Sequence, residues 1–220
     1  MVALYILIPV LFGAVSALVW ARRTDHRLVE YISKPFSTLL VIAIALLALG
    51  QPGVMPAYTW VIALGLLLSL GGDVSLMLRT NRWFLIGLVL FLLAHVAYSV
   101  AFSMRSGFQP ADWIVALVLL AIGAAIYAYL RPGLGRMRGP VLMYLAVILF
   151  MVSRGVSTLF GSAFSPTQAW LIAAGAVLFM LSDLLLAINR FRRPFKAEAY
   201  GLYLYYAGQL LIALSTWPWR

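Results

Sequence analysis

Apolar runs of about 20 residues recur along the whole chain, and this recurrence restricts the fold more than any other feature. A run of that length is what an α-helix needs to cross a hydrocarbon core roughly 30 Å thick. The chain is 65% hydrophobic with a mean hydropathy of +1.02, which is more apolar surface than a soluble domain of 220 residues can bury. The sequence therefore predicts an all-α, polytopic integral membrane protein.

The apolar runs predict eight transmembrane helices. The segments between them are too short to form a separate domain, so we expect residues 1–220 to make a single integral-membrane domain. The first run is followed by Arg22 and Arg23 and has no basic segment before it, so it is expected to be a retained helix and not a signal peptide. The predicted spans are 2–20, 32–50, 57–78, 83–104, 112–130, 140–160, 168–189 and 198–217.

Basic residues alternate between the loops. The loops after the first, third, fifth and seventh spans carry most of the arginines, whereas the even loops carry only Arg105. The positive-inside rule then predicts that the odd loops are cytoplasmic and that both termini lie outside, in the inner (plasma) membrane if the source is a bacterium. The net charge of +10 is explained by this orientation signal, and we expect no nucleic-acid partner.

The sequence also indicates an internal repeat. "GLVLFLLAHV" from Gly87 and "GLYLYYAGQL" from Gly201 align without a gap, and the third and seventh spans align on Asp73 and Asp183. The repeat predicts two parallel four-helix halves, 1–110 and 111–220, related by an axis along the membrane normal.

Asp73 and Asp183 are acids inside otherwise apolar spans. They precede Arg79 and Arg190 by six and seven residues, which puts both about 10 Å below the same membrane boundary. If the third and seventh spans meet, the two carboxylates can face each other and supply one proton donor and one acceptor. The alternative is that each aspartate only holds neighbouring helices together by hydrogen bonds.

Further polar residues lie within the predicted fourth and eighth spans. His95 lies deeper than the acids and could move protons or bind a substrate, or could be a neutral histidine bonded across helices. Tyr98 is on the same helix face one turn away, and the last span carries Tyr205 and Gln209. We expect these side chains to line the interior of the bundle.

Three residues near the ends of spans have two interpretations each. Lys34 could extend to the membrane surface or could bind a lipid phosphate or one of the acids. Asn189 could cap the seventh span or contact a headgroup. Arg154 is predicted nearer the outer face, and the sequence leaves open whether it is a partner for polar groups in the outer half or reaches the outer surface.

The sequence favours chemistry without a metal or a cofactor. The chain has no cysteine and only two histidines, and their spacing matches no recognised ligand pattern.

The chain resembles a known family in five stretches: "SKPFSTLL", "SLGGDVSLML", "FLIGLVLFLLAHVAYSVAF", "LSDLLLAINRF" and "LYYAGQLLIALS", in that order. They are similar to the YhhN-like family of eight-span membrane proteins, whose characterised animal members are lysoplasmalogenases. The resemblance implies metal-free hydrolysis of the vinyl ether bond of a lysophospholipid substrate, giving a fatty aldehyde and glycerophospho-ethanolamine or -choline. It implies Asp73 and Asp183 as the catalytic pair. The residues expected to bind the substrate are Lys34, His95, Tyr98, Asn189, Tyr205 and Gln209.

Two other functions fit the same residues. A small proton-coupled transporter of a lipid or amphiphile would use the two aspartates as proton carriers. A lipid-binding scaffold would perform no chemistry. Membrane lipids are expected neighbours in every case, and the sequence does not indicate an oligomeric state.

Overall fold

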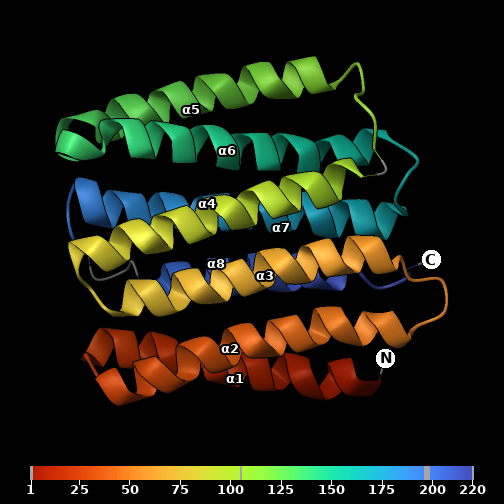
Figure 1. The fold of residues 1–220 in the computed structure, drawn as a ribbon, viewed down its shortest axis with the longest axis horizontal. Coiled ribbons are helices and arrows are strands. Elements are labelled where there is room, and N and C mark those ends of the chain that lie inside the picture. The colour runs from red at the N-terminus through yellow and green to blue at the C-terminus, as the bar shows by residue number, and fades with distance from the viewer. Residues whose placement is uncertain (1, 105, 196–198, 220) are drawn as a thin grey trace.

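The computed structural model describes residues 2–104, 106–195 and 199–219, and within these ranges the chain is helical and has no strand (Figure 1). The all-α prediction is therefore confirmed. The α-helices of this part of the chain are α1 (Val2–Thr24), α2 (Arg27–Leu47), α3 (Pro56–Met77), α4 (Asn81–Ser103), α5 (Asp112–Leu134), α6 (Arg138–Ser157), α7 (Pro166–Phe191) and α8 (Gly201–Leu214).

Six described segments are long and apolar enough to cross a membrane, so the predicted count of eight spans is not confirmed. One of the six, Asp112–Phe160, contains both α5 and α6, which fold back on each other at Gly135, where φ is +50° (Figure 1). The helix α8 has 14 residues, fewer than a full crossing requires. The predicted division into two parallel halves is untested and stays a prediction.

Local sequence signals explain where several helices begin. Pro56 and Pro166 stand in the first turn of α3 and α7, where a missing N–H costs no hydrogen bond. Ser165 and Gln168 form a capping box at the start of α7. Thr80 accepts a hydrogen bond from the Trp83 amide at the start of α4.

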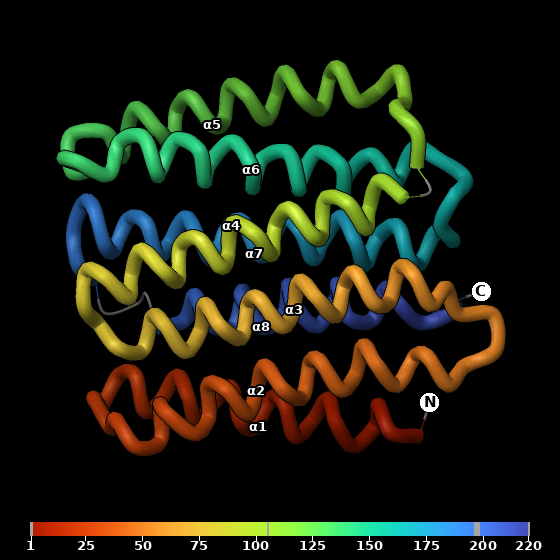
Figure 2. The backbone as a smooth tube through the Cα atoms, in the orientation of Figure 1, coloured from red at the N-terminus to blue at the C-terminus, as the bar shows by residue number. Residues whose placement is uncertain are grey.

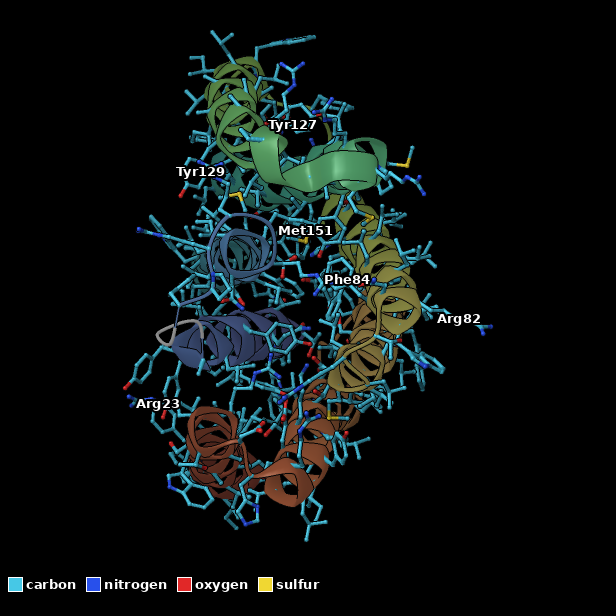
Figure 3. All side chains as sticks on the ribbon, turned by 90° about the vertical axis from the view of Figure 1, so that its left-hand side faces the viewer. Arg23, Arg82, Phe84, Tyr127, Tyr129 and Met151 are labelled. Carbon is cyan, nitrogen blue, oxygen red and sulfur yellow. The ribbon has the colours of Figure 1, made fainter. Side chains whose placement is uncertain are left out.

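The helices run antiparallel in sequence order, so the odd-numbered loops gather at one end of the bundle (left in Figures 1 and 2). This end carries most of the arginines, and its cytoplasmic position stays a prediction. Figure 3, viewed from this end, shows α2, α3 and α4 in one row facing α1, α8 and α7. Phe84 points into the space between the rows, whereas Arg23 and Arg82 point away from the bundle (Figure 3).

Two glycines allow α7 and α8 to pack with their backbones in contact. A Cβ atom at Gly175 would lie 2.9 Å from the Gly208 carbonyl oxygen, and one at Gly208 would lie 2.9 Å from the Gly175 carbonyl oxygen. Small residues at such crossings are typical of membrane helix pairs, where close backbone approach replaces the hydrophobic driving force.

Gly208→Ala is expected to destabilise the fold by about 1–3 kcal/mol, because the added methyl group must push two helix backbones apart. Thermal unfolding in detergent measures the loss. The control is Gly13→Ala in α1, where a Cβ atom meets nothing within 4 Å. Equal melting temperatures for the two variants would contradict the close contact.

Arg154, whose role the sequence left open, lies at the opposite end of the bundle from the arginine-rich loops. Its side chain is buried and donates to the Asp112 carboxylate (3.0 Å), the Ser103 hydroxyl (2.9 Å) and the Ser106 carbonyl (2.7 Å). The residue therefore fastens α6 to α5 and to the end of α4. We assign Arg154 a structural role.

Candidate functional site: a polar cavity joined to an apolar cleft

A cavity of about 270 Å³ opens between the two rows of helices, near the end that carries the odd loops. Both aspartates lie on its wall, together with four basic side chains and one glutamate. Its polar lining residues are Arg22, Glu30, Lys34, Asp73, Arg79, Thr80, Ser182, Asp183, Asn189, Arg190 and Tyr205.

Asp73 lies in α3 and is 1% exposed. Lys34 Nζ from α2 lies 3.2 Å from Asp73 Oδ1. The hydroxyls of Thr38 (2.7 Å) and Tyr205 (2.8 Å) both donate to Asp73 Oδ2. A buried carboxylate needs such partners, because leaving a charge unpaired away from water is costly. Asp73 is thus held by α2 and α8 in one fixed orientation.

Lys34 takes part in the site and does not extend to the membrane surface. It is 8% exposed, and its ammonium group also donates to the Asp73 carbonyl oxygen at 3.3 Å. The Lys34 carbonyl in turn accepts a hydrogen bond from the Tyr206 hydroxyl at 2.9 Å. Among the alternatives that the sequence allowed, the structure shows Lys34 paired with an acid, and the binding of a lipid phosphate stays a prediction.

Asp183 lies in α7 in different surroundings. Its Oδ2 accepts a hydrogen bond from the Tyr144 hydroxyl of α6, and His95 Nε2 of α4 lies 3.8 Å from the same oxygen. Its side chain is 14% exposed, against 2% for the Asp73 side chain, so Asp183 is the more accessible of the two acids. In the described part of the chain, no lysine or arginine forms an ion pair with Asp183.

The two carboxylates face one cavity although their helices do not pack directly along their length. The main neighbours of α3 are α4 and α2, and the main neighbour of α7 is α8. The cavity lies in the space left between α3 and α7, and Asp73 and Asp183 line it from these two helices. Both acids thus line one cavity, in agreement with the expectation that they share one space. The helices α3 and α7 are not main packing neighbours, so the expected direct contact between the two spans is not what brings the acids together.

A second, smaller cleft of about 70 Å³ adjoins the cavity and is almost wholly apolar. Its walls come from α3 to α7 and include Leu130, Leu145 and Ile148. Five residues line both spaces: Leu76, Phe84, Phe91, Asp183 and Leu186. Asp183 therefore stands where a polar compartment meets an apolar one.

Three residues predicted to bind the substrate lie behind the cavity wall. Tyr98 donates to Gln209 Oε1 (2.8 Å), and Gln209 Nε2 donates to the Tyr205 hydroxyl (3.2 Å), so this buried chain supports the tyrosine that contacts Asp73. His95 is fully buried between Phe179 and Tyr144, with ring centroids 4.8 and 5.3 Å away. Neither ring nitrogen of His95 has a hydrogen-bond partner among the described residues.

The other predicted binding residues lie on the cavity wall. Lys34 and Tyr205 contact Asp73, as described above. Asn189 also lines the cavity, and its Oδ1 accepts a hydrogen bond from the Phe195 amide at 3.0 Å. Asn189 therefore faces the cavity and also holds the segment that follows α7, although it lies inside the helix and does not cap it. Its contact with a headgroup stays a prediction.

Sequence reasoning missed several members of the site. Thr38 and Tyr144, which bond directly to the two acids, gave no signal because hydroxyl residues are common in membrane helices. Glu30 is 1% exposed and pairs with Arg22 and with Arg79, whose Nη2 lies 2.6 Å from Glu30 Oε2. Its position four residues before Lys34, on the same helix face, was a signal that could have found it.

No group of three or more histidine, aspartate and glutamate side chains is arranged to hold a metal ion within residues 2–104, 106–195 and 199–219.

The fold and the site define a class: helical integral membrane proteins with an acid-lined polar cavity at one end and an apolar cleft beside it. Comparison with known families narrows the class. The profile of the YhhN family matches residues 29–216, which includes every residue of the cavity except those from α1. The chain belongs to the YhhN family.

Curated relatives fall into two groups. The chain is 35% identical over 159 residues to lysoplasmalogenase TMEM86A of Bos taurus and of Homo sapiens, covering 70% of this chain and 64% of each relative. It is 30% identical over 191 residues to an uncharacterized membrane protein YhhN of Escherichia coli O157:H7, covering 86% of this chain and 87% of the relative. The chain thus spans under two thirds of the named lysoplasmalogenases. No solved structure matches it significantly.

Proposed function

We propose that the protein is a membrane-embedded hydrolase that cleaves the vinyl ether bond of a lysoplasmalogen. The products would be a fatty aldehyde and glycerophospho-ethanolamine or -choline. Support comes from the relatives named lysoplasmalogenase and from two acids on one cavity wall.

The observation that carries the proposal is the position of Asp183 at the junction of the two compartments. A lysoplasmalogen has a charged headgroup, one hydrocarbon chain, and the vinyl ether between them. With the headgroup in the polar cavity and the chain in the apolar cleft, the vinyl ether lies beside Asp183. A single cleft also suits a lipid with one chain.

The two acids take different roles because their partners differ. Asp73, paired with Lys34 and two hydroxyl donors, is the carboxylate. Asp183, which contacts a tyrosine hydroxyl and an imidazole, is the acid that carries the proton. This assignment matches the division of labour between two carboxyl groups in glycoside hydrolysis.

The reaction consumes one water molecule and needs no oxidant or reductant. Asp183 protonates the vinyl carbon farther from oxygen, which leaves an oxocarbenium ion that the Asp73 carboxylate stabilises. Water then adds to the cationic carbon and gives up a proton to a carboxylate. The bond from the resulting hemiacetal carbon to the glycerol oxygen then breaks, and that oxygen takes the proton that the carboxylate received from water. The hemiacetal hydroxyl gives its own proton back to the carboxylate, and the aldehyde forms.

The direct test uses the purified protein in detergent. We expect it to release aldehyde from lysoplasmenyl-ethanolamine and to leave the saturated 1-O-alkyl analogue intact, because that analogue has no double bond to protonate. Uptake of the lipid into protein-containing liposomes without any aldehyde would overturn the proposal in favour of a transporter.

Leu145→Trp is expected to lower activity on long-chain substrates about tenfold or more, because the indole would fill the apolar cleft. Shorter chains should be affected less, so the ratio of rates across a chain-length series is the measurement. Leu142→Trp, on the outward face of the same helix, is the control and should behave as wild type. Equal effects on all chain lengths would argue against the cleft as the chain site.

A further inference from the structure

The four basic side chains on the cavity wall are not equivalent. Lys34 pairs with Asp73, Arg22 with Glu30, and Arg79 with both Glu30 and Asp25. These three cations are already neutralised by carboxylates of the protein.

Arg190 differs from the other three. Its Nη2 donates to the side-chain oxygen of Asn81 at 2.6 Å, and its guanidinium lies 4.8 Å from the centre of the Phe84 ring. Both partners are neutral, and no carboxylate pairs with Arg190 in the part of the chain that the structure describes. Among the described residues, the positive charge of Arg190 thus lines the cavity without a carboxylate partner.

Arg190 also lies at a suitable offset from the proposed reaction centre. It follows Asp183 by seven residues on α7, about 10 Å along the axis, and two turns of helix keep it on the same face. Leu186 and Asn189 line the cavity between them. In a lysoplasmalogen, one glycerol unit separates the vinyl ether from the phosphate. The order of hydrocarbon chain, vinyl ether and phosphate along the lipid therefore matches the order of apolar cleft, Asp183 and Arg190 in the protein.

We infer that Arg190 binds the phosphate of the substrate headgroup and thereby selects phospholipids over neutral ether lipids. The inference rests on the proposed function and adds the residue that reads the headgroup. A guanidinium matches two phosphate oxygens with two parallel N–H donors, which a neutral amide does not replace. The Asn81 side-chain oxygen accepts one N–H of the guanidinium, which leaves its other N–H groups to meet a phosphate, and the Phe84 ring supports the guanidinium.

The experiment measures binding without turnover. Saturated 1-O-alkyl-lysophosphoethanolamine and the corresponding 1-O-alkylglycerol, which lacks the phosphate, are titrated into the full-length protein in detergent by calorimetry. Arg190→Gln is expected to weaken binding of the phospholipid about tenfold or more and to leave binding of the alkylglycerol within about twofold. Arg190→Lys should lie between wild type and Arg190→Gln.

Two variants serve as controls. Arg192→Gln removes a neighbouring arginine that stacks on Tyr129 and does not line the cavity, so it should bind both lipids as wild type does. Asn81→Ala removes the protein partner of Arg190 without removing the cation, and should bind the phospholipid at least as tightly as wild type. If Asn81→Ala reproduces Arg190→Gln, the arginine braces α7 against α4, and the inference is overturned.

The remaining outcomes separate this inference from the proposed function. Equal weakening for both lipids, or no weakening for either, overturns the phosphate site even if wild type releases aldehyde. Conversely, phosphate-dependent binding that is lost in Arg190→Gln supports the site even if wild type releases no aldehyde, and only the proposed chemistry then fails.

Discussion

Asp183→Asn is expected to lower kcat for aldehyde release by about 10³-fold, because the variant has no proton to give to the vinyl carbon. The amide keeps the size of the carboxyl group and an oxygen that can accept the Tyr144 hydrogen bond. The fold should therefore survive, and substrate binding should change little. Aldehyde production and melting temperature, measured on the same preparation, separate chemistry from folding.

The matched control is Asp25→Asn. Asp25 is an exposed carboxylate on the α1–α2 loop that pairs with Arg27 and with Arg79. Arg79 keeps its pair with Glu30 when Asp25 is changed, so the loss of Asp25 should change kcat less than about twofold. If Asp183→Asn retains the wild-type rate while Asp25→Asn behaves as expected, the proposed role of Asp183 is wrong.

Lys34→Met is the second variant with a large expected effect, and it should lower the free energy of unfolding by about 3–5 kcal/mol. The substitution leaves the Asp73 carboxylate buried without its cation, with only the Thr38 and Tyr205 hydroxyls as partners. Thermal unfolding in detergent measures the loss. Wild-type stability in Lys34→Met would mean that the ion pair contributes little.

The double variant Lys34→Met/Asp73→Asn separates the charge pair from the chemistry. Removing both charges leaves no unpaired ion, so most of the stability should return. The catalytic carboxylate is absent, so aldehyde release should stay near the background rate. A double variant that is both stable and active would remove Asp73 from the mechanism.

The sequence was sufficient to find the acids and Lys34, because a charge inside an apolar span is rare and costly. It could not find Thr38 or Tyr144 as their partners. A hydroxyl in a membrane helix can bond to its own backbone, and only the packing of α2 and α6 beside the acids decides otherwise. The helical fold followed from hydropathy, whereas the number of spans did not, since α8 is short.

Depth along a helix was also a poor guide to what lines the cavity. Tyr98 and Gln209 lie on polar faces of their helices, as expected, yet they turn toward each other and hold Tyr205 from behind. Arg190 was counted among the basic loop residues that indicate membrane orientation, because a basic loop residue and a cavity cation look alike in sequence. The rotation of each helix about its own axis decides which side chains face the cavity. This rotation is set by how the whole bundle packs, so the sequence of one helix does not give it.

The junction at Asp183 also bears on how the products would leave. The proposed cleavage there would divide an amphiphile at its own polarity boundary, so each fragment would be left in surroundings that match it. The aldehyde would be left in the apolar cleft and the glycerol phosphodiester in the polar cavity. Neither product would then have to cross the compartment of the other to leave.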